Sequence, residues 1–174
     1  MKKINFSIKE MTLVAIFASS IAVLSQISIP MPSAVPLTIQ IFAIALAGYF
    51  LSVKEAILSV AVYILIGAVG MPVFSGFKGG FYVLIGPSGG FIWGFIIVAI
   101  LCAIFAKGAL AVPLGAFSVV ICHMLGIIQY MIFSKIGFWE SAMVVSLPYI
   151  AKDILLVILA YVINLKIKKQ MKIV

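Results

Sequence analysis

Charged side chains are scarce in this sequence. Only 9% of its 174 residues are charged, arginine is absent, and the carboxylates are limited to Glu10, Glu55, Glu140 and Asp153. Hydrophobic residues make up 66% of the chain, and the polar side chains are too few to cover that much apolar surface in water. This composition excludes a water-soluble fold and indicates an all-α protein of the lipid bilayer.

Features of phosphate, metal and nucleic-acid binding are also missing. The chain has no Walker motif, so it does not hydrolyse ATP through a P-loop. Its two cysteines, Cys102 and Cys122, fall inside predicted helices, where buried packing is the commoner role, so we expect neither a metal nor a cofactor. The net charge of +8 comes from lysines clustered at chain ends and turns. They are not interleaved with stacking aromatics, so we expect no nucleic-acid partner.

Long apolar runs take up most of the chain. The first run resembles a secretory signal, but it is too long for one and lacks a clear cleavage site. The second and third runs are short for a hydrocarbon core that needs about 20 residues, so a single interrupted helix is the alternative to two spans. The runs predict six transmembrane helices in a single membrane domain, residues 1–174, with spans near residues 11–29, 37–51, 56–69, 91–106, 110–133 and 147–165.

The distribution of lysines favours six spans over five. With six spans both termini lie on one side of the membrane, and only Lys78, Lys135 and Lys152 lie at or near the other side. Lysine excess marks the cytoplasmic side, which predicts cytoplasmic termini in a multi-pass protein of a prokaryotic plasma membrane. The lysines that fall together on the predicted cytoplasmic side are Lys2, Lys3, Lys9, Lys54, Lys107, Lys166, Lys168, Lys169 and Lys172.

The predicted outer loops differ from the inner turns, which are short. They read "SIPMPSAVP", "MPVFSGFKGGFYVLIGPSGG" and "SKIGFWES", and they carry most of the prolines and glycines. Irregular backbone near a bilayer persists only where protein or water satisfies its amide groups. The outer end is therefore predicted to be a packed cap over a cavity, where glycines let the backbone approach a small polar ligand.

Two opposite charges, Lys152 and Asp153, stand together at the head of the last apolar run, "LPYIAKDILLVILAY". A charge at the centre of a spanning helix costs roughly 2.5 to 3.5 kcal/mol. Lys152 could extend its amine to the lipid headgroups, and Asp153 could compensate the helix dipole. However, Asp153 is the only carboxylate inside a predicted span, it is too short to reach far, and it lies at the capped end. We therefore predict that the pair belongs to a ligand site.

Three stretches resemble the BioY family, the biotin-specific S components of energy-coupling-factor transporters. They are "IPMPSAVPLTIQ" (29–40), "LSVAVYILIGAVGMPVFSG" (58–76) and "GGFYVLIGPSGGFIWGF" (79–95), and the resemblance returns at "LPYIAKD". It implies a six-helix protein, not an enzyme, that captures biotin from outside and associates with a transmembrane coupling subunit and two ATPase subunits. It also implies a docking face of small residues on the first helix, for which Ala18 and Ala22 are the candidates.

The last helix of this family typically pairs an aspartate with a lysine three residues later. Asp153 matches, but position 156 is a leucine. Lys152 precedes that position by four residues, so on a helix it lies about 40° away in azimuth and roughly 6 Å nearer the outer surface. Our hypothesis is that Lys152 supplies the missing amine. The alternative is a different small acid, such as lipoate, as the substrate.

The chemistry of biotin suggests roles for the predicted site residues. Asp153 is expected to accept the ureido N–H groups, and Lys152 to donate to the ureido carbonyl or pair with the carboxylate tail. Lys78 is a candidate to pair with the carboxylate tail. Gln40 is a candidate to hydrogen-bond the ligand or to cap the loop backbone. The remaining candidates are Tyr82 and Trp93, which could pack on the bicyclic ring, and Gly86 and Ser88 from the turn that enters the fourth span.

Two rival functions remain open at this point. "GPSG" (86–89) and the single histidine, His123, would fit a rhomboid-type intramembrane serine protease with Ser88 as nucleophile. That histidine falls in the fifth span instead of the sixth, so we expect it to be buried and hydrogen-bonded to a neighbouring helix. The second rival is a carrier that works alone on an ion gradient.

Overall fold

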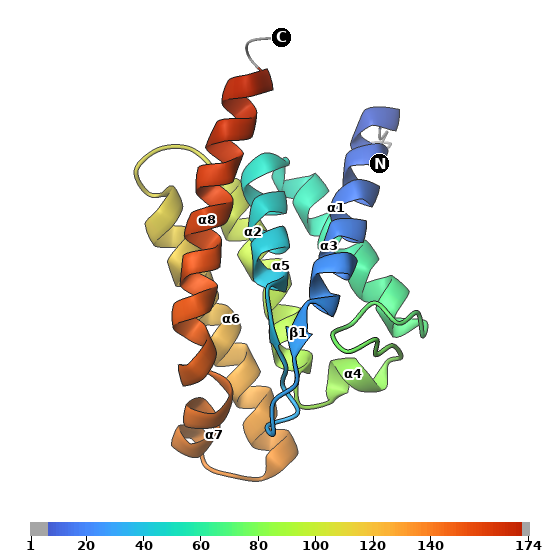
Figure 1. The fold of residues 1–174 in the computed structure, drawn as a ribbon, viewed down its shortest axis with the longest axis vertical. Coiled ribbons are helices and arrows are strands. Elements are labelled where there is room, and N and C mark those ends of the chain that lie inside the picture. Colours follow the sequence, from blue (N-terminus) through green and yellow to red (C-terminus); the bar gives the residue numbers. More distant parts are fainter. Residues whose placement is uncertain (1–6, 172–174) are drawn as a thin grey trace, which may run out of the picture.

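The fold of the chain is known from a computed structural model that describes residues 7–171 (Figure 1). Lys2, Lys3 and Lys172, three of the lysines that predict the orientation in the membrane, lie outside the described residues. The described chain consists of α1 (Ile8–Gln26), β1 (Ser28–Ile29), β2 (Leu37–Thr38), α2 (Gln40–Phe50), α3 (Val53–Ala68), α4 (Tyr82–Ile85), α5 (Gly89–Ile104), α6 (Ala111–Ser134), α7 (Phe138–Val145) and α8 (Leu147–Met171).

The long helices run side by side, and the two ends of the bundle differ. Figure 1 shows both ends of the described chain at one end, together with the α2–α3 turn and the α5–α6 connection; we call this the terminal end. The β1–β2 hairpin, α4 and α7 lie at the opposite end, which we call the cavity end. Every predicted outer loop maps to the cavity end.

Local polar contacts fix where several helices begin. Ser7 and Glu10 form a capping box at the start of α1, and Ser52 and Glu55 form another at the start of α3. In such a box the serine side chain and the glutamate carboxylate each satisfy a backbone N–H that has no partner within the helix. At α7 the Glu140 carboxylate accepts from the N–H of Gly137 at 2.9 Å.

The second and third predicted spans form two separate helices. The chain turns at Leu51 and Ser52, between the end of α2 and the start of α3. Both helices pack against α5, while the other main neighbour is α8 for α2 and α1 for α3. This division excludes the single interrupted helix that the short apolar runs had left open.

Each predicted span falls on a helix, but fewer of these helices are both long enough and apolar enough to count as membrane-spanning candidates. Among the described residues α1 and α6 are long and apolar enough to cross a membrane, and the bent pair α7 and α8, at 52°, could count as a third. The helices α2 and α5 are apolar but shorter, with 11 and 16 residues. The structure thus gives a mostly helical fold with two or three such candidates.

A short hairpin interrupts the predicted all-helical pattern. Strands β1 and β2 pair antiparallel, with Ser28 opposite Thr38 and Ile29 opposite Leu37. Proline-rich sequence joins them, and α4 and α7 are further short elements that the apolar runs did not predict. These elements build the cap at the cavity end, where β2 leads directly into α2.

Both cysteines are buried packing residues, as expected. Cys102 packs against Gly48, where an added Cβ would lie only 2.6 Å from the Cys102 Cβ. Cys122 packs against Gly94, where an added Cβ would lie only 2.6 Å from the Cys122 Sγ. Small residues thus let α2, α5 and α6 approach closely. The described residues contain no group of three metal-ligating side chains.

The predicted docking face on the first helix needs revision. Ala18 is only 5% exposed and Ala22 packs, partly buried, against the main hydrophobic core, so both face the chain's own helices. The side of α1 that points away from the bundle carries Ala15 and Ser19, which line a shallow groove. Periodicity alone could not tell the two faces apart because α1 is apolar on every side.

Candidate functional site

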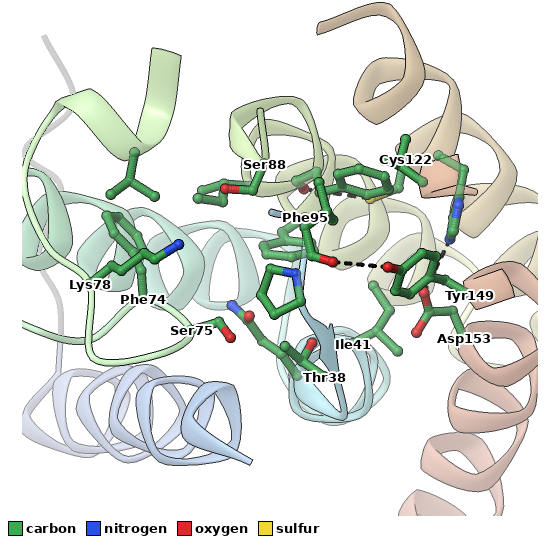
Figure 2. Close-up of a pocket in the computed structure, with 18 of the residues that line it drawn as sticks. Thr38, Ile41, Phe74, Ser75, Lys78, Ser88, Phe95, Cys122, Tyr149 and Asp153 are labelled. Atoms are coloured by element: carbon green, nitrogen blue, oxygen red, sulfur yellow. Dashed lines mark hydrogen bonds and ion pairs between the residues drawn. The ribbon is translucent and has the colours of Figure 1, made fainter. Parts of the chain in front are cut away.

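A cavity at the cavity end gathers most of the predicted site residues (Figure 2). It encloses about 750 Å³ of empty space, including the solvent at its open mouth. Its wall comes from the hairpin and from helices distant in sequence, including α2, α5, α6 and α8. Five of the seven predicted ligand-binding residues line it: Gln40, Lys78, Ser88, Lys152 and Asp153.

The other two predicted residues lie beside the cavity. Tyr82 and Gly86 line a neighbouring depression that shares Lys78 and Ser88 with the cavity wall. Tyr82 is 62% exposed, and the Gly86 carbonyl accepts a hydrogen bond from Gln129 Nε2 at 2.7 Å, which ties α4 to α6. The structure therefore does not bring Tyr82 and Gly86 into the cavity.

Trp93 does not line the cavity either. Its indole N–H donates to the carbonyl of Leu84 at 3.3 Å, and 44% of the residue is exposed. The aromatic side chains on the cavity wall are instead Tyr63, Phe74, Phe91, Phe95 and Tyr149. Tyr63 and Phe74 pack edge to face with centroids 5.4 Å apart. These rings give the cavity an apolar wall suited to a hydrophobic ligand body.

Lys152 and Asp153 form an ion pair on the cavity wall. The lysine Nζ lies 2.5 Å from Asp153 Oδ1 and also donates to the carbonyl of Thr38 on β2. The amine thus points inward to the hairpin, which excludes the snorkelling alternative. Asp153 lies six residues beyond the start of α8 at Leu147, past the first turn where the helix dipole acts on a charge.

His123 completes this charged cluster. Its Nε2 lies 3.1 Å from Asp153 Oδ2 and its Nδ1 lies 2.9 Å from Ser146 Oγ, and the residue is 2% exposed. The ring also packs edge to face on Phe91. The expectation of a buried histidine bonded to a neighbouring helix is confirmed. Sequence reasoning did not place it next to Asp153, because only the fold brings α6 and α8 together.

The cluster leaves Asp153 able to accept further hydrogen bonds. Each carboxylate oxygen offers two acceptor positions, and each accepts from one internal donor, Lys152 or His123. A serine hydroxyl that donates to Nδ1 leaves the proton of a neutral imidazole on Nε2, facing the carboxylate. The buried carboxylate is therefore hydrogen-bonded at both oxygens and ion-paired with Lys152, and a ligand N–H group could use the remaining acceptor positions.

Tyr149 connects α8 to the hairpin, a role that sequence reasoning missed. Its hydroxyl donates to the Val35 carbonyl at 2.9 Å and lies 3.3 Å from Ser33 Oγ. Tyr149 precedes Lys152 by three residues and Asp153 by four, a spacing that places all three on one side of a helix. That spacing was the available signal in "LPYIAKD".

A tight turn at residues 74–78 forms the opposite wall. Phe74 and Lys78 exchange backbone hydrogen bonds of 2.9 and 3.2 Å, and Gly76 and Phe77 adopt positive φ. The last turn of α1 holds this turn: Gln26 Nε2 donates to the Val73 carbonyl at 3.0 Å, and its Oε1 accepts from the Phe77 N–H at 2.9 Å. The end of α1 thereby positions Lys78.

Ser88 and His123 do not form a catalytic pair. Both line the cavity, but the histidine nitrogens contact Ser146 and Asp153, and no hydrogen bond joins His123 to Ser88 among the described residues. Ser146 does not line the cavity. The arrangement holds a carboxylate in place and offers no exposed nucleophile next to a base.

Comparisons with known proteins point to one family. A family model described as "BioY family" matches residues 1–173. The chain is 35% identical over 158 residues to the "Biotin transporter BioY" of Thermotoga maritima, which covers 88% of this chain and 92% of the relative. It is 35% identical over 146 residues to the "Probable biotin transporter BioY" of Pyrococcus horikoshii, covering 84% and 88%.

The fold also matches a solved structure. The crystal structure of the S component for biotin from an ECF-type ABC transporter superposes with a TM-score of 0.84 at 26% identity. The match covers 93% of this chain and 92% of the other. The likeness therefore extends over almost the whole of both proteins.

Proposed function

This chain belongs to the BioY family, and on that premise we propose that it captures biotin at the outer face of the membrane for an energy-coupling-factor transporter. Its relatives are biotin transporters, and it is a transport subunit, not an enzyme. The observation that carries the proposal is the paired Lys152 and Asp153 on the wall of an otherwise largely apolar cavity.

The cavity suits the chemistry of biotin. The sulfur-containing ring and the alkyl chain of biotin are apolar, which matches the aromatic wall, and its ureido ring presents two N–H donors beside a carbonyl. In our proposal Asp153 accepts from the ureido N–H groups and Lys152 takes the place of the lysine absent at position 156. Leu156 itself packs, half-buried, against the hydrophobic core. Lys78 meets the carboxylate tail from the turn on the opposite wall.

We place all six predicted spans in the membrane, with the terminal end in the cytoplasm. The shorter helices α2 and α5 can span because protein surrounds them, and the hairpin and turns that extend them are hydrogen-bonded within the fold. Lysines of distant segments lie close together at the terminal end. The charge of Lys54 interacts electrostatically with the Glu10 carboxylate, and Lys107 lies near Lys168. Such an excess of lysine is typical of the cytoplasmic side.

The absence of a Walker motif in the sequence supports an energy source outside this chain, and the match to an S component of an ECF-type transporter supports partner subunits as that source. We propose that a transmembrane coupling subunit and two ATPase subunits supply the energy, and that the coupling subunit docks on the exposed side of α1. Ala15 and Ser19 stand four residues apart on that side, a spacing that permits close helix approach.

Calorimetric titration of the purified protein with biotin and with lipoate tests the ligand. We expect biotin to bind at least about a hundredfold more tightly, because lipoate lacks the ureido donors for Asp153. The reverse order would favour the alternative suggested by Leu156, which is a different small acid as substrate.

Uptake of labelled biotin tests the partners. Cells that lack their own biotin transporter would express this chain either alone or with a coupling subunit and two ATPases of an energy-coupling-factor transporter. We expect uptake only with the full set of subunits, and loss of uptake when the ATPase P-loop lysine is replaced. Full uptake by this chain alone would favour a solitary carrier.

A further inference from the structure

Two buried polar atoms on the cavity wall lack a hydrogen bond. Gln40 Nε2 and Ser75 Oγ have no partner among the described residues, and both residues line the cavity. Gln40 is only 4% exposed. A buried polar group without a partner costs roughly 1 to 3 kcal/mol, so native folds satisfy nearly all of them. These two atoms therefore point to a group that enters from the cavity.

One of the two atoms belongs to the wall formed by the 74–78 turn, and the other, in Gln40, lies at the start of α2. Ser75 is part of that turn. The Tyr63 hydroxyl lies beside the side chains of Gln40 and Ser25, and Ser25 Oγ donates to the Val73 carbonyl at 2.5 Å. Gln40 is thus connected to the residue that leads into the turn.

Figure 2 shows how this wall stands relative to the charged cluster. Lys78 and Ser75 lie on one side of the cavity, and Asp153 and Tyr149 lie on the other. A ligand that spans the cavity therefore meets two polar surfaces of different chemistry, one at each end.

The surface opposite Asp153 presents hydrogen-bond donors. A lysine ammonium only donates, a serine hydroxyl can donate, and an amide NH₂ only donates. An amide NH₂ carries two N–H donors, so one remains for a ligand oxygen even where the other faces the Tyr63 hydroxyl. Donors that gather in a largely apolar cavity favour an anionic oxygen, because hydrogen bonds to charged groups are the stronger ones.

We propose that Ser75 and Gln40, together with Lys78, bind the carboxylate of the transported acid. The inference rests on the proposed function and extends it, because it makes the acid group a recognised part of the substrate. In this arrangement Asp153 accepts from the ureido N–H groups at one end, and the 74–78 wall donates to the carboxylate at the other. Substrates are then selected at both ends.

Titration of wild-type protein and the Ser75→Ala variant with biotin and with biotinamide tests this assignment. Biotinamide keeps the ureido ring and replaces the carboxylate with a neutral amide. We expect Ser75→Ala to weaken biotin binding about tenfold and biotinamide binding about threefold or less, because the lost hydrogen bond is charge-assisted only in the acid. Thermal unfolding would verify that the variant is folded.

Ser141→Ala is the matched control. Ser141 Oγ is also buried without a partner, but it lies on α7 and does not line the cavity. We expect this variant to bind both ligands as the wild type does. A second variant, Gln40→Glu, places a negative charge on the same wall, and we expect it to weaken biotin much more than biotinamide.

The outcomes separate this inference from the proposed function. If Ser75→Ala and Gln40→Glu weaken both ligands equally, or weaken neither, the carboxylate is bound elsewhere and the inference is wrong while biotin capture stands. If the folded wild type does not bind biotin at all, both the proposed function and the inference that rests on it fail.

Discussion

The terminal end and the cavity end of the bundle use polar side chains in opposite ways. At the terminal end the polar contacts are mostly local: Ser7 bonds Glu10 and Ser52 bonds Glu55, each within one helical turn. Among the described residues the long-range exceptions at this end include Tyr49, which donates to Ala111, and neither residue lines the cavity described above. Here polar groups serve to begin helices and to join them.

At the cavity end the polar contacts cross long stretches of sequence. Lys152 reaches Thr38, and Tyr149 reaches Val35. In addition, Gln26 holds the turn that contains Phe77. Apolar packing and local caps therefore suffice to build the bundle, whereas the site depends on polar contacts between distant segments. Variants at the two ends should therefore change different properties.

Asp153→Asn should have the largest effect. It removes the negative charge that pairs with Lys152 and that accepts from His123, and it weakens the acceptor for the ureido group. We expect biotin affinity to fall by at least about a hundredfold, since a hydrogen-bonded charge pair is broken. Calorimetric titration measures the change. Glu140→Gln, a carboxylate change in the cap of α7, is the control and should keep its affinity.

Lys152→Met should weaken binding by about 10- to 100-fold, because it removes the amine shared by Asp153 and Thr38. A double variant that adds Leu156→Lys returns a lysine to the position typical of the family. We expect it to regain part of the affinity in the same titration. If the single variant binds biotin as the wild type does, Lys152 does not replace the missing lysine.

Two substitutions of His123 separate the effect of its contact with Asp153 from the effect of its contact with Ser146. Glutamine places an amide nitrogen near the position of Nε2, which faces Asp153, and asparagine places one near Nδ1, which faces Ser146. We expect His123→Gln to keep affinity within about fivefold and His123→Asn to lose more than about tenfold. Equal losses in binding titrations would mean that the contact with Asp153 does not matter for the ligand.

Gln26→Ala should release the 74–78 turn. The glutamine lies on α1, away from the cavity wall, so we expect faster dissociation of biotin, by about five- to tenfold, with little change in the overall fold. Stopped-flow displacement of a fluorescent biotin conjugate measures this rate. Ser20→Ala removes a hydroxyl that bonds only within its own helix, to Ile16, and should leave the rate unchanged.

Ser52→Ala should have the smallest effect on binding. It removes the cap of α3 at the terminal end, and we expect a stability loss of about 1 kcal/mol with unchanged biotin affinity. Thermal unfolding in detergent and titration measure the two properties. A marked loss of affinity would contradict the division between the two ends of the bundle.

The same division explains what could be predicted from the sequence. The apolar runs located the helix ends to within three residues, because hydrophobic length and turn residues are local properties, but α8 continues to Met171, beyond the predicted end at residue 165. The charge of Asp153 on an apolar run pointed to the site for the same reason. The β1–β2 hairpin was missed, because strand pairing depends on contacts between segments and not on local pattern.

Other features depend on which segments the fold brings together. His123 was predicted to be buried, but its contact with Asp153 depends on how α6 packs against α8. The side of α1 that faces the bundle is equally invisible from its sequence, so Ala18 was assigned to the wrong face. Ser75 had no signal at all, since only the folded cavity shows that its hydroxyl lacks a partner.

A crystal structure of the protein with biotin would test the central claim most directly. We expect the ureido nitrogens within hydrogen-bond distance of the Asp153 carboxylate, and the bicyclic ring against the aromatic wall formed by α3, α5, α8 and the 74–78 turn. Biotin bound outside this cavity, or bound inside it with the ureido group turned away from Asp153, would contradict the account.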